Sequence, residues 1–426
     1  MSRIAVIDGI RTPFVKYQTD FRSLSAQELG RIACRELIER TGLDPALLDE
    51  VIIGCVAQPA EAANLARVVA LLAGVPERVP AFTVHRNCAS GIEAAVQAVL
   101  KIRQDEGALY LTGGTESMSN IPLYYSAKTQ QIFAELARAK TLPARLRAFA
   151  KFRMGELLKP TVGLMQGLTD PVCGLNMGQT AEVLAKEFGI TRQEQDDFAL
   201  QSHQRAVAAR DRLREEIVPV IPGPKYGKAV ENDNGPREQQ TIEALAKLRP
   251  VFDRHAGSVT AGNASQITDG ACSLLIAKEE KARELGYVPL GYIREFAFAG
   301  VEPHRMGIGP AHAIPQVLRK AGMNMSDVQA FEINEAFAVQ VLACLRLLAS
   351  DAFAKRFGYE GFTGEISPDK INVNGGAIAL GHPVGTTGAR LILTMLKHMQ
   401  REGLSTGLVS LCIGGGQGAA VILERE

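Results

Sequence analysis

Short apolar runs alternate with amphipathic helical patterns near both ends of the chain, and this order limits the possible folds more than any other feature. In the N-terminal part we expect, in order, Ile4–Ile7 (strand), Ala26–Arg40 (helix), Val51–Gly54 (strand), Ala62–Ala73 (helix), Ala81–Val84 (strand), Gly91–Arg103 (helix) and Ala108–Thr112 (strand). Strands that each give way to a helix predict a layered α/β fold, because the helices then cover the faces of a shared sheet.

The last third of the chain repeats this scheme. Its expected elements are a strand ending at Glu332–Ile333, a helix at Ala336–Leu348, a strand at Asn372–Asn374, a helix at Thr387–Met399, a strand at Gly407–Leu411 and a hairpin partner at Ala419–Leu423. Both parts contain, in the same order, a strand, a helix start flanked by glycines, the helix itself, a second strand and a glycine cluster. This pattern predicts an internal duplication, although two α/β segments can also share it by chance.

The composition is that of an ordinary globular protein. The 426 residues suffice for two or three compact units, each with its own core. Hydrophobic residues make up 46% and charged residues 22%, and the formal net charge is +1. A charge so close to zero gives no reason to expect a nucleic-acid partner.

The cysteines and the start of the chain bear on the compartment. Seven cysteines, odd in number and without CxxC spacing, argue against a disulfide framework or a zinc site and favour a reducing compartment. Met1–Gly9 reads directly into a strand and lacks the features of a signal or transit peptide. No apolar stretch reaches the roughly 18 residues that a membrane span needs. We therefore expect a cytoplasmic protein without a metal site.

The middle of the chain, residues 120–249, lacks the regular alternation and contains a basic amphipathic stretch at 128–159. This stretch holds eight basic and two acidic residues, and its apolar residues recur near helical spacing: Leu142, Leu146, Phe149, Phe152 and Leu157. One interpretation is a solvated helix that packs on its own domain. The other is a site for an anionic partner: a coenzyme phosphate, an acidic subunit or a membrane surface.

Cys88 is the first candidate for chemistry. It lies within His85–Glu93, after a predicted strand and at the start of a predicted helix. Free N–H groups and the positive end of the helix dipole lower the pKa of a thiol at such a position, and the same groups can hold an oxyanion. A cysteine among small residues is more often an inert core residue, so position alone leaves both interpretations open.

Two further polar residues lie where a turn meets a helix. His382 stands between Gly381 and Pro383, and this rigid turn suits either a base directed at a substrate or a histidine with structural hydrogen bonds. Asn334 lies where a predicted strand turns into a helix, where it either caps the helix or positions a water.

Cys412 ends a predicted strand before three consecutive glycines, Gly414 to Gly416. The bare amides of such a turn can bind an anion. A phosphate loop is the competing interpretation, but the chain has no GxxxxGK[ST] sequence and no acidic residue at dinucleotide-fold spacing.

Together these segments resemble the active-site motifs of the thiolase family. The matching segments, in the family's order, are Arg86–Gly91, Asn334–Phe337, Gly381–Pro383 and Cys412–Gly418, and Val259–Ser265 resembles the family's coenzyme-side segment. The likeness covers essentially the whole chain. It implies the α/β thiolase fold, in which two similar layered halves each contain a five-stranded mixed sheet and a loop domain is inserted in the first half.

The resemblance also implies domain boundaries and an assembly. The N-terminal half would comprise residues 1–119 and 250–277, the loop domain 120–249, and the C-terminal half 278–426. The family forms homodimers or homotetramers. It uses coenzyme A (CoA) and acyl-CoA as substrates and has no covalently bound cofactor.

Carried over position by position, the resemblance implies a two-step acyl transfer in which Cys88 becomes acylated. His382 would take the Cys88 proton and help hold the thioester oxyanion, and Asn334 would complete that oxyanion hole through a water. Cys412 would move a proton to or from the α-carbon of acetyl-CoA. The amides of Cys88 and Gly414 would form a second hole for the acyl-enzyme carbonyl.

Four further residues match the family's substrate contacts. Ser265 matches the position that touches the pantetheine arm, and Phe337 and Met177 match residues that line the acyl pocket. Arg237 matches a nucleotide-contacting arginine.

Two features bear on the substrate. Short-chain acetoacetyl-CoA thiolases usually carry a histidine where this chain has Asn176. Lys140–Leu146 resembles the thiolase subunit of trifunctional fatty-acid oxidation complexes, which implies a hydratase/dehydrogenase partner subunit or a membrane-proximal role. Val259–Ser265, however, is common to short-chain enzymes too. The resemblance thus favours a 3-ketoacyl-CoA thiolase of β-oxidation over an acetyl-CoA acetyltransferase.

Two other classes fit less well. Acyl-CoA- or lipid-binding relatives without catalysis often lack the second cysteine, whereas this chain has both Cys88 and Cys412. A β-ketoacyl synthase would carry a second histidine in place of Cys412.

Overall fold

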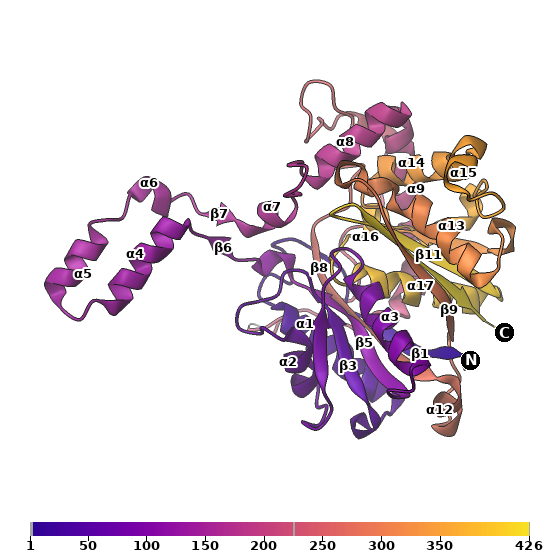
Figure 1. The fold of residues 1–426 in the computed structure, drawn as a ribbon, viewed down its shortest axis with the longest axis horizontal. Helices are drawn as coiled ribbons and strands as arrows, with labels where there is room; N and C mark the ends of the chain where they lie inside the picture. The colour runs from indigo at the N-terminus through magenta and orange to yellow at the C-terminus, as the bar shows by residue number, and fades with distance from the viewer. Residues whose placement is uncertain (1–2, 225, 426) are drawn as a thin grey trace. The chain divides into compact units, whose positions relative to one another are not determined.

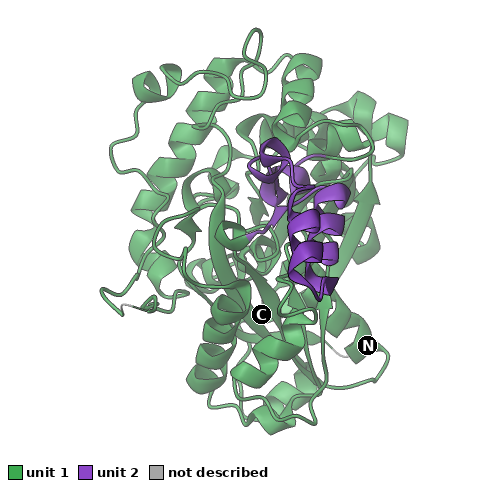
Figure 2. Ribbon diagram, turned by 90° about the vertical axis from the view of Figure 1, so that its left-hand side faces the viewer, with its two compact units in different colours: residues 1–120, 170–426 green, residues 121–169 purple. Residues whose placement is uncertain are grey.

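The computed structural model describes residues 3–224 and 226–425. The chain forms two compact units, one of residues 1–120 and 170–426 and a smaller one of residues 121–169 (Figure 2). Within the described residues, no helix is long and apolar enough to cross a membrane.

The larger unit is built on a mixed sheet. Its strands are β1 (Ile4–Arg11), β2 (Val15–Lys16), β3 (Glu50–Gly54), β4 (Ala81–Val84), β5 (Leu109–Glu116), β8 (Thr268–Lys278), β9 (Gly291–Gly300), β10 (Ala330–Ile333), β11 (Thr406–Ile413) and β12 (Gln417–Glu424). Their order is β10-β11-β12-β9-β1-β8-β5-β3-β4, and β2 pairs with β8 (Figure 1).

The two halves of this sheet share one topology. In the first half, β3 is parallel to β4 and β5, and β8 is antiparallel to β5 and β1. In the second half, β10 is parallel to β11, and β12 is antiparallel to β11 and β9. Ile371 makes a single parallel bridge to Phe331, at the place that β4 occupies in the first half. The predicted fold of two similar halves is confirmed, and pairing of β1 with β9 joins the halves into one sheet.

Helices cover both faces of the sheet. They are α1 (Ala26–Thr41), α2 (Leu65–Leu72), α3 (Ser90–Arg103), α8 (Met177–Phe188), α9 (Arg192–Ala208), α10 (Arg210–Arg214), α11 (Ile242–Ala246), α12 (Glu279–Glu284), α13 (Gly309–Ala321), α14 (Ala338–Leu348), α15 (Asp351–Phe357), α16 (Ala377–Leu380) and α17 (Thr387–Glu402). Short 3₁₀ turns lie at Pro45–Leu47, Met118–Asn120, Pro303–Ile308, Met325–Asp327 and Pro368–Lys370.

Three apolar clusters define the layers. The helices α3 and α17 share one cluster with strands from both halves of the sheet. The helices α1 and α2 pack on the other face of the first half, and α13 and α14 do so in the second half (Figure 1). The pair α3 and α17 therefore lies between the two halves. This position matters because the predicted nucleophile precedes α3 and the predicted base precedes α17.

Local sequence explains why the helices begin where they do. Ser25 caps α1 in a reciprocal capping box with Glu28, and Gly42 ends that helix with φ +63°. Asn64 caps α2, so this helix begins three residues later than the sequence predicts.

Two predictions in the second half were wrong. The expected strand at Asn372–Asn374 is a turn, since Asn372 has φ +49°. The helix expected from Ala336 begins at Ala338 because Phe337 is extended and forms a bridge with Ala264. In both places the backbone is bent for tertiary contacts that no local pattern reveals.

The smaller unit consists of β6 (Leu123–Tyr124), α4 (Ala127–Arg138), α5 (Leu142–Phe149), α6 (Met154–Leu157), β7 (Thr161–Val162) and α7 (Gly163–Gly167), and β6 pairs with β7. The basic stretch at 128–159 is thus several short helices rather than one. This unit lies inside the predicted loop domain of 120–249, whose outer boundaries stay a prediction, as do those at residues 119 and 277.

Candidate active site

Cys88 lies in a tight turn between β4 and α3. Hydrogen bonds of 3.0 Å from the Ala89 N–H to the Arg86 oxygen and from the Ser90 N–H to the Asn87 oxygen form this turn. Burial raises the pKa of the Cys88 thiol, whereas hydrogen bonds from the backbone amides of Gly414 and Cys88 lower it. The thiol therefore lies against two N–H donors, one from its own residue and one from the glycine turn between β11 and β12.

Close packing of two helix starts brings the Cys88 turn to the His382 loop. A Cβ at Gly91 would lie 2.6 Å from the Ala389 nitrogen, and one at Gly388 would lie 2.5 Å from the Ile92 nitrogen. Only glycines allow the backbones of α3 and α17 to approach so closely.

Glu116 ties the same loop to the sheet. Its buried carboxylate accepts hydrogen bonds from the N–H groups of Val56 (3.0 Å), Ala57 (2.9 Å) and Gly385 (2.8 Å). Burial raises the pKa of Glu116, and these amide donors lower it. The loop that carries His382 is thus anchored three residues after the histidine.

His382 is buried, and its two ring nitrogens have different surroundings. Nδ1 lies 2.6 Å from Thr387 Oγ1, and that hydroxyl lies 3.1 Å from the Pro383 oxygen. Nε2 is buried and has no hydrogen-bond partner among the described residues. Burial, and then the charge of Arg390, lower the pKa of His382 to about 3, so the ring is neutral near pH 7.

Asn334 directly follows β10, and Cys412 lies near the end of the neighbouring parallel strand β11. The Asn334 N–H donates to the Ser410 oxygen at 2.9 Å, which continues the strand pairing. The Oδ1 and Nδ2 atoms of Asn334 are buried without a hydrogen-bond partner among the described residues. Such a side chain is suited to hold a water or a substrate oxygen. It does not cap α14.

Cys412 is 1% exposed. Burial raises the pKa of Cys412 well above its usual value, and the neighbouring Cys88 and Cys344 raise it further. The thiol is therefore protonated near pH 7 and can give up a proton only to a strongly basic atom.

Glu335, the residue after Asn334, links two segments of the site. Its carboxylate accepts from Ser202 Oγ (2.6 Å), Asn372 Nδ2 (2.9 Å) and the Ile378 N–H (3.2 Å). These contacts bind the Asn334 segment to the segment that leads into His382.

The predicted acyl-pocket residues gather in one apolar cluster with Cys412. Met177 and Phe337 belong to it, and the Phe337 ring packs edge-on against Phe252 with centroids 6.2 Å apart. A Cβ at Gly414 would lie 3.3 Å from Met177 Sδ, so Met177 covers the glycine turn. Asn176 forms a capping box with Gln179 at the start of α8, which explains an asparagine at this position.

The predicted CoA contacts lie around the same segments. The partly exposed Ser265 donates its N–H to the Ala336 oxygen at 2.9 Å, next to Phe337. The exposed Arg237 follows Gly235, whose oxygen accepts from Gln266 Nε2 at 3.3 Å. Gln266 is adjacent to Ser265, so the fold brings Arg237 and Ser265 to the same region.

Sequence reasoning missed four residues that hold the site: Asn87, Glu116, Glu335 and Thr387. Asn87 and Glu335 lie within recognised motifs and Thr387 follows one, whereas Glu116 ends β5, away from every motif. Each acts through a partner far away in the sequence or through a turn that only the folded chain defines. In the sequence, the one signal that pointed to such a residue was an acidic residue directly beside a motif residue, as in Asn334-Glu335.

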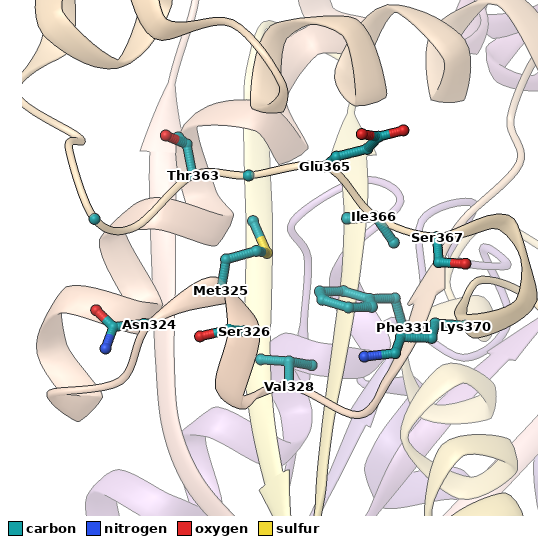
Figure 3. Close-up of a pocket in the computed structure, with 12 residues that line it drawn as sticks. Asn324, Met325, Ser326, Val328, Phe331, Thr363, Glu365, Ile366, Ser367 and Lys370 are labelled. Carbon is teal, nitrogen blue, oxygen red and sulfur yellow. The ribbon is translucent and has the colours of Figure 1, made fainter.

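A hollow of about 300 Å³ lies elsewhere in the second half (Figure 3). Met325, Val328 and Phe331 line one side, and Thr363 and Glu365 point away from them. None of the predicted site residues lines it. In the described part of the chain, no group of three or more histidine, cysteine or acidic side chains is arranged to hold a metal ion.

Comparison with known proteins identifies the family. The family model described as thiolase, N-terminal domain, matches residues 4–280, and that described as thiolase, C-terminal domain, matches residues 287–425. The chain belongs to the thiolase family. It is an acyltransferase of that family, and its fold is the thiolase fold.

Individual relatives match over the full length of this thiolase. A 3-ketoacyl-CoA thiolase of Yersinia enterocolitica is 40% identical over 428 residues, which cover 100% of this chain and 97% of that protein. The structure of human mitochondrial 3-ketoacyl-CoA thiolase in complex with CoA has a TM-score of 0.85 at 35% identity and covers 100% and 98% of the two chains. An acetyl-CoA acetyltransferase from Syntrophomonas wolfei has a TM-score of 0.87 at 36% identity, with both chains covered fully.

Proposed function

We propose that this thiolase cleaves 3-ketoacyl-CoA with CoA, giving acetyl-CoA and a shortened acyl-CoA. The proposal is supported by the Cys88 thiol, which lies near the Gly414 amide and Cys412. It is also supported by the close packing of the Cys88 turn against the loop of His382, whose Nε2 has no hydrogen-bond partner among the described residues. The similarity to proteins named 3-ketoacyl-CoA thiolase supports the substrate.

In the first step, Cys88 attacks the 3-keto carbon and passes its proton to His382 Nε2. Because burial keeps the thiol protonated and the imidazole neutral, the resting pair is uncharged and the proton moves as the bond forms. The oxyanion on the 3-keto oxygen lies between the amides of Cys88 and Gly414.

In the second step, the bond between the α-carbon and the 3-keto carbon breaks. The electron pair passes to the acetyl-CoA fragment as an enolate, whose oxygen is held by the His382 Nε2–H and by a water on Asn334. Cys412 protonates the α-carbon. CoA then attacks the acyl-Cys88 thioester and its thiol proton passes to the Cys412 thiolate. The bond between the acyl carbon and the Cys88 sulfur breaks, the acyl group stays on CoA, and His382 returns its proton to the Cys88 sulfur.

The test is cleavage of acetoacetyl-CoA and 3-ketohexadecanoyl-CoA by purified protein with CoA, beside Cys88→Ser. Faster cleavage of the long substrate, with the variant inactive, supports the proposal. Faster cleavage of acetoacetyl-CoA would assign an acetyl-CoA acetyltransferase instead. No cleavage of either would leave a relative that binds acyl-CoA without catalysis.

We further propose that the protein forms a homodimer or homotetramer and works in the cytoplasm. The strand β4 is an edge strand of partly exposed residues, among them Phe82 and Val84, and such an edge favours pairing with a second copy. All seven cysteines are free, which fits a reducing compartment. Sedimentation equilibrium at micromolar concentration tests the assembly, and a monomer would contradict it.

The helices at 128–159 support a docking proposal. In α5, Leu142, Leu146 and Phe149 are 70%, 62% and 63% exposed at helical spacing, and Arg145 and Arg147 lie between them. Short helices with exposed apolar and basic side chains bind anionic lipid surfaces. We therefore favour a membrane surface over the other candidate, a hydratase/dehydrogenase subunit.

Co-sedimentation with vesicles tests this docking. We expect binding to vesicles with phosphatidylglycerol, weaker binding at high salt, and loss of binding in Leu146→Glu/Phe149→Glu. Val288→Glu, which changes a residue that is 89% exposed outside this region, is the matched control. No vesicle binding together with capture by a hydratase/dehydrogenase would assign the partner subunit instead.

A further inference from the structure

Asn87 stands one residue before Cys88 and has an uncommon backbone. Its φ is +43°, in the left-handed region that asparagine tolerates better than most residues with a side chain. The Asn87 carbonyl oxygen, which accepts from the Ser90 N–H at 3.0 Å and from Ser90 Oγ at 2.7 Å, holds this turn. The side chain of Asn87 is therefore not needed for its own turn.

The side chain instead bonds to the glycine turn across the site. Asn87 Nδ2 donates to the Gly414 oxygen at 2.7 Å. A Cβ at Gly415 would lie 3.8 Å from the same nitrogen, so the amide covers this part of the turn. Gly415 and Gly416 have φ values of +89° and +82°, and a backbone without side chains rotates easily unless something fixes it.

The Gly414 N–H also lies close enough to the Cys88 thiol to lower its pKa. One residue of the turn thus accepts a hydrogen bond from Asn87 and presents its N–H to the reacting sulfur. A second link runs from Arg86 Nη1 to Gln417 Oε1 at 3.3 Å, at the far end of the turn. The residues before the nucleophile therefore hold the turn at both ends.

We propose that Asn87 is a positioning residue: by holding the Gly414 carbonyl it fixes the backbone around the Gly414 Cα, so that the Gly414 N–H is directed at the acyl carbonyl oxygen on Cys88. This inference rests on the proposed thiolase reaction. Removing an oxyanion-hole donor costs about 10²–10³-fold in kcat. Loss of the Asn87 side chain leaves this donor in place but free to rotate, so only part of the full loss of kcat is expected. We therefore expect kcat to fall about 10-fold to 100-fold.

Two substitutions separate this role from a purely structural one. Asn87→Gly keeps the left-handed backbone and removes the donor, and Asn87→Asp keeps the shape but turns an oxygen toward the Gly414 oxygen. Asp105→Gly is the matched control, because Asp105 also has a positive φ (+56°) but lies on the surface and pairs with Lys278. Thermal unfolding of every variant shows how much protein is folded.

The readouts are kcat and KM for thiolysis, and the rate of Cys88 alkylation by iodoacetamide as a function of pH. We expect both Asn87 variants to lose kcat with KM for CoA within about twofold of the parent, and to shift the alkylation midpoint to higher pH. The control should do neither. Unchanged kcat and alkylation profiles in Asn87→Gly, or losses that only follow the loss of folded protein, would overturn the proposal. If the parent protein cleaves no substrate, the proposed function fails, while the alkylation profile still tests the link between Asn87 and Cys88.

Discussion

Thr387 decides which nitrogen of His382 can accept a proton. When its hydroxyl donates to the Pro383 oxygen, it accepts from Nδ1–H, which leaves Nε2 as the basic atom. We predict that Thr387→Val lowers kcat about 10-fold to 100-fold, since general-base catalysis contributes about 10²–10⁴-fold and loss of the tautomer removes part of it.

Steady-state thiolysis checks this prediction. Thr387→Ser, which keeps the hydroxyl, should stay within about threefold of the parent enzyme. Equal kcat in Thr387→Val and Thr387→Ser would show that the hydroxyl does not set the tautomer.

The buried His382 also makes stability depend on pH. Its pKa of about 3 in the folded state lies below the value of about 6.5 in an unfolded chain. Between these values the unfolded chain binds a proton that the folded protein excludes, so stability is full above about pH 6.5 and falls as the pH decreases toward 3. One such proton changes the free energy of unfolding by about 1.4 kcal/mol per pH unit.

Urea unfolding of the parent and of His382→Gln at pH 7.5 and pH 5 measures this effect. The difference between the two pH values should be smaller in the variant, because glutamine does not titrate. Parallel pH dependence in both proteins would contradict the assignment.

At the scale of elements, the site depends on how closely α3 and α17 approach each other. A Cβ at Gly91 would meet backbone atoms of α17, which cannot move aside as a flexible side chain can. We predict that Gly91→Ala lowers the free energy of unfolding by about 1–3 kcal/mol and reduces activity by displacing Cys88 from His382.

Gly155→Ala is the matched control for this change, because nothing lies within 4 Å of a Cβ there. It should be neutral or stabilise the protein by up to about 1 kcal/mol. Equal stability of the two variants in urea unfolding would mean that the helices separate at little cost.

At the scale of the whole molecule, pairing of β5 with β8 joins residues 1–120 and 170–426 into one unit. In the sequence, the smaller unit lies between these two strands. The strands β5 and β8 pair from Leu109↔Ala277 to Glu116↔Gly270. The smaller unit contains many exposed basic side chains and few buried residues. We predict that trypsin cleaves first within 121–169 and that the two larger fragments still elute together on gel filtration.

Mass spectrometry of the fragments and gel filtration of the nicked protein provide the measurement. Separation of the fragments, or first cleavage elsewhere, would show that the smaller unit does more to hold the chain together than its contacts indicate.

The sequence by itself determined the layered α/β class and the duplication, because hydrophobic periodicity and glycine-flanked helix starts are local signals. It also singled out Cys88, His382, Cys412 and Asn334, whose motifs surround them in the chain, and these roles remain proposals. It failed where the backbone serves a distant partner, as in the turn at Asn372 and the late start of α14.

Only the tertiary structure decided what surrounds these residues. The hydrogen bond from Asn87 to Gly414 joins positions 327 residues apart, and that from the Gly385 N–H to the Glu116 carboxylate joins positions 269 apart. Burial likewise keeps His382 neutral and the thiols of Cys88 and Cys412 protonated. Contacts across such separations, and the desolvation that accompanies them, exist only once two helices and two halves of a sheet pack together, so no local pattern encodes them.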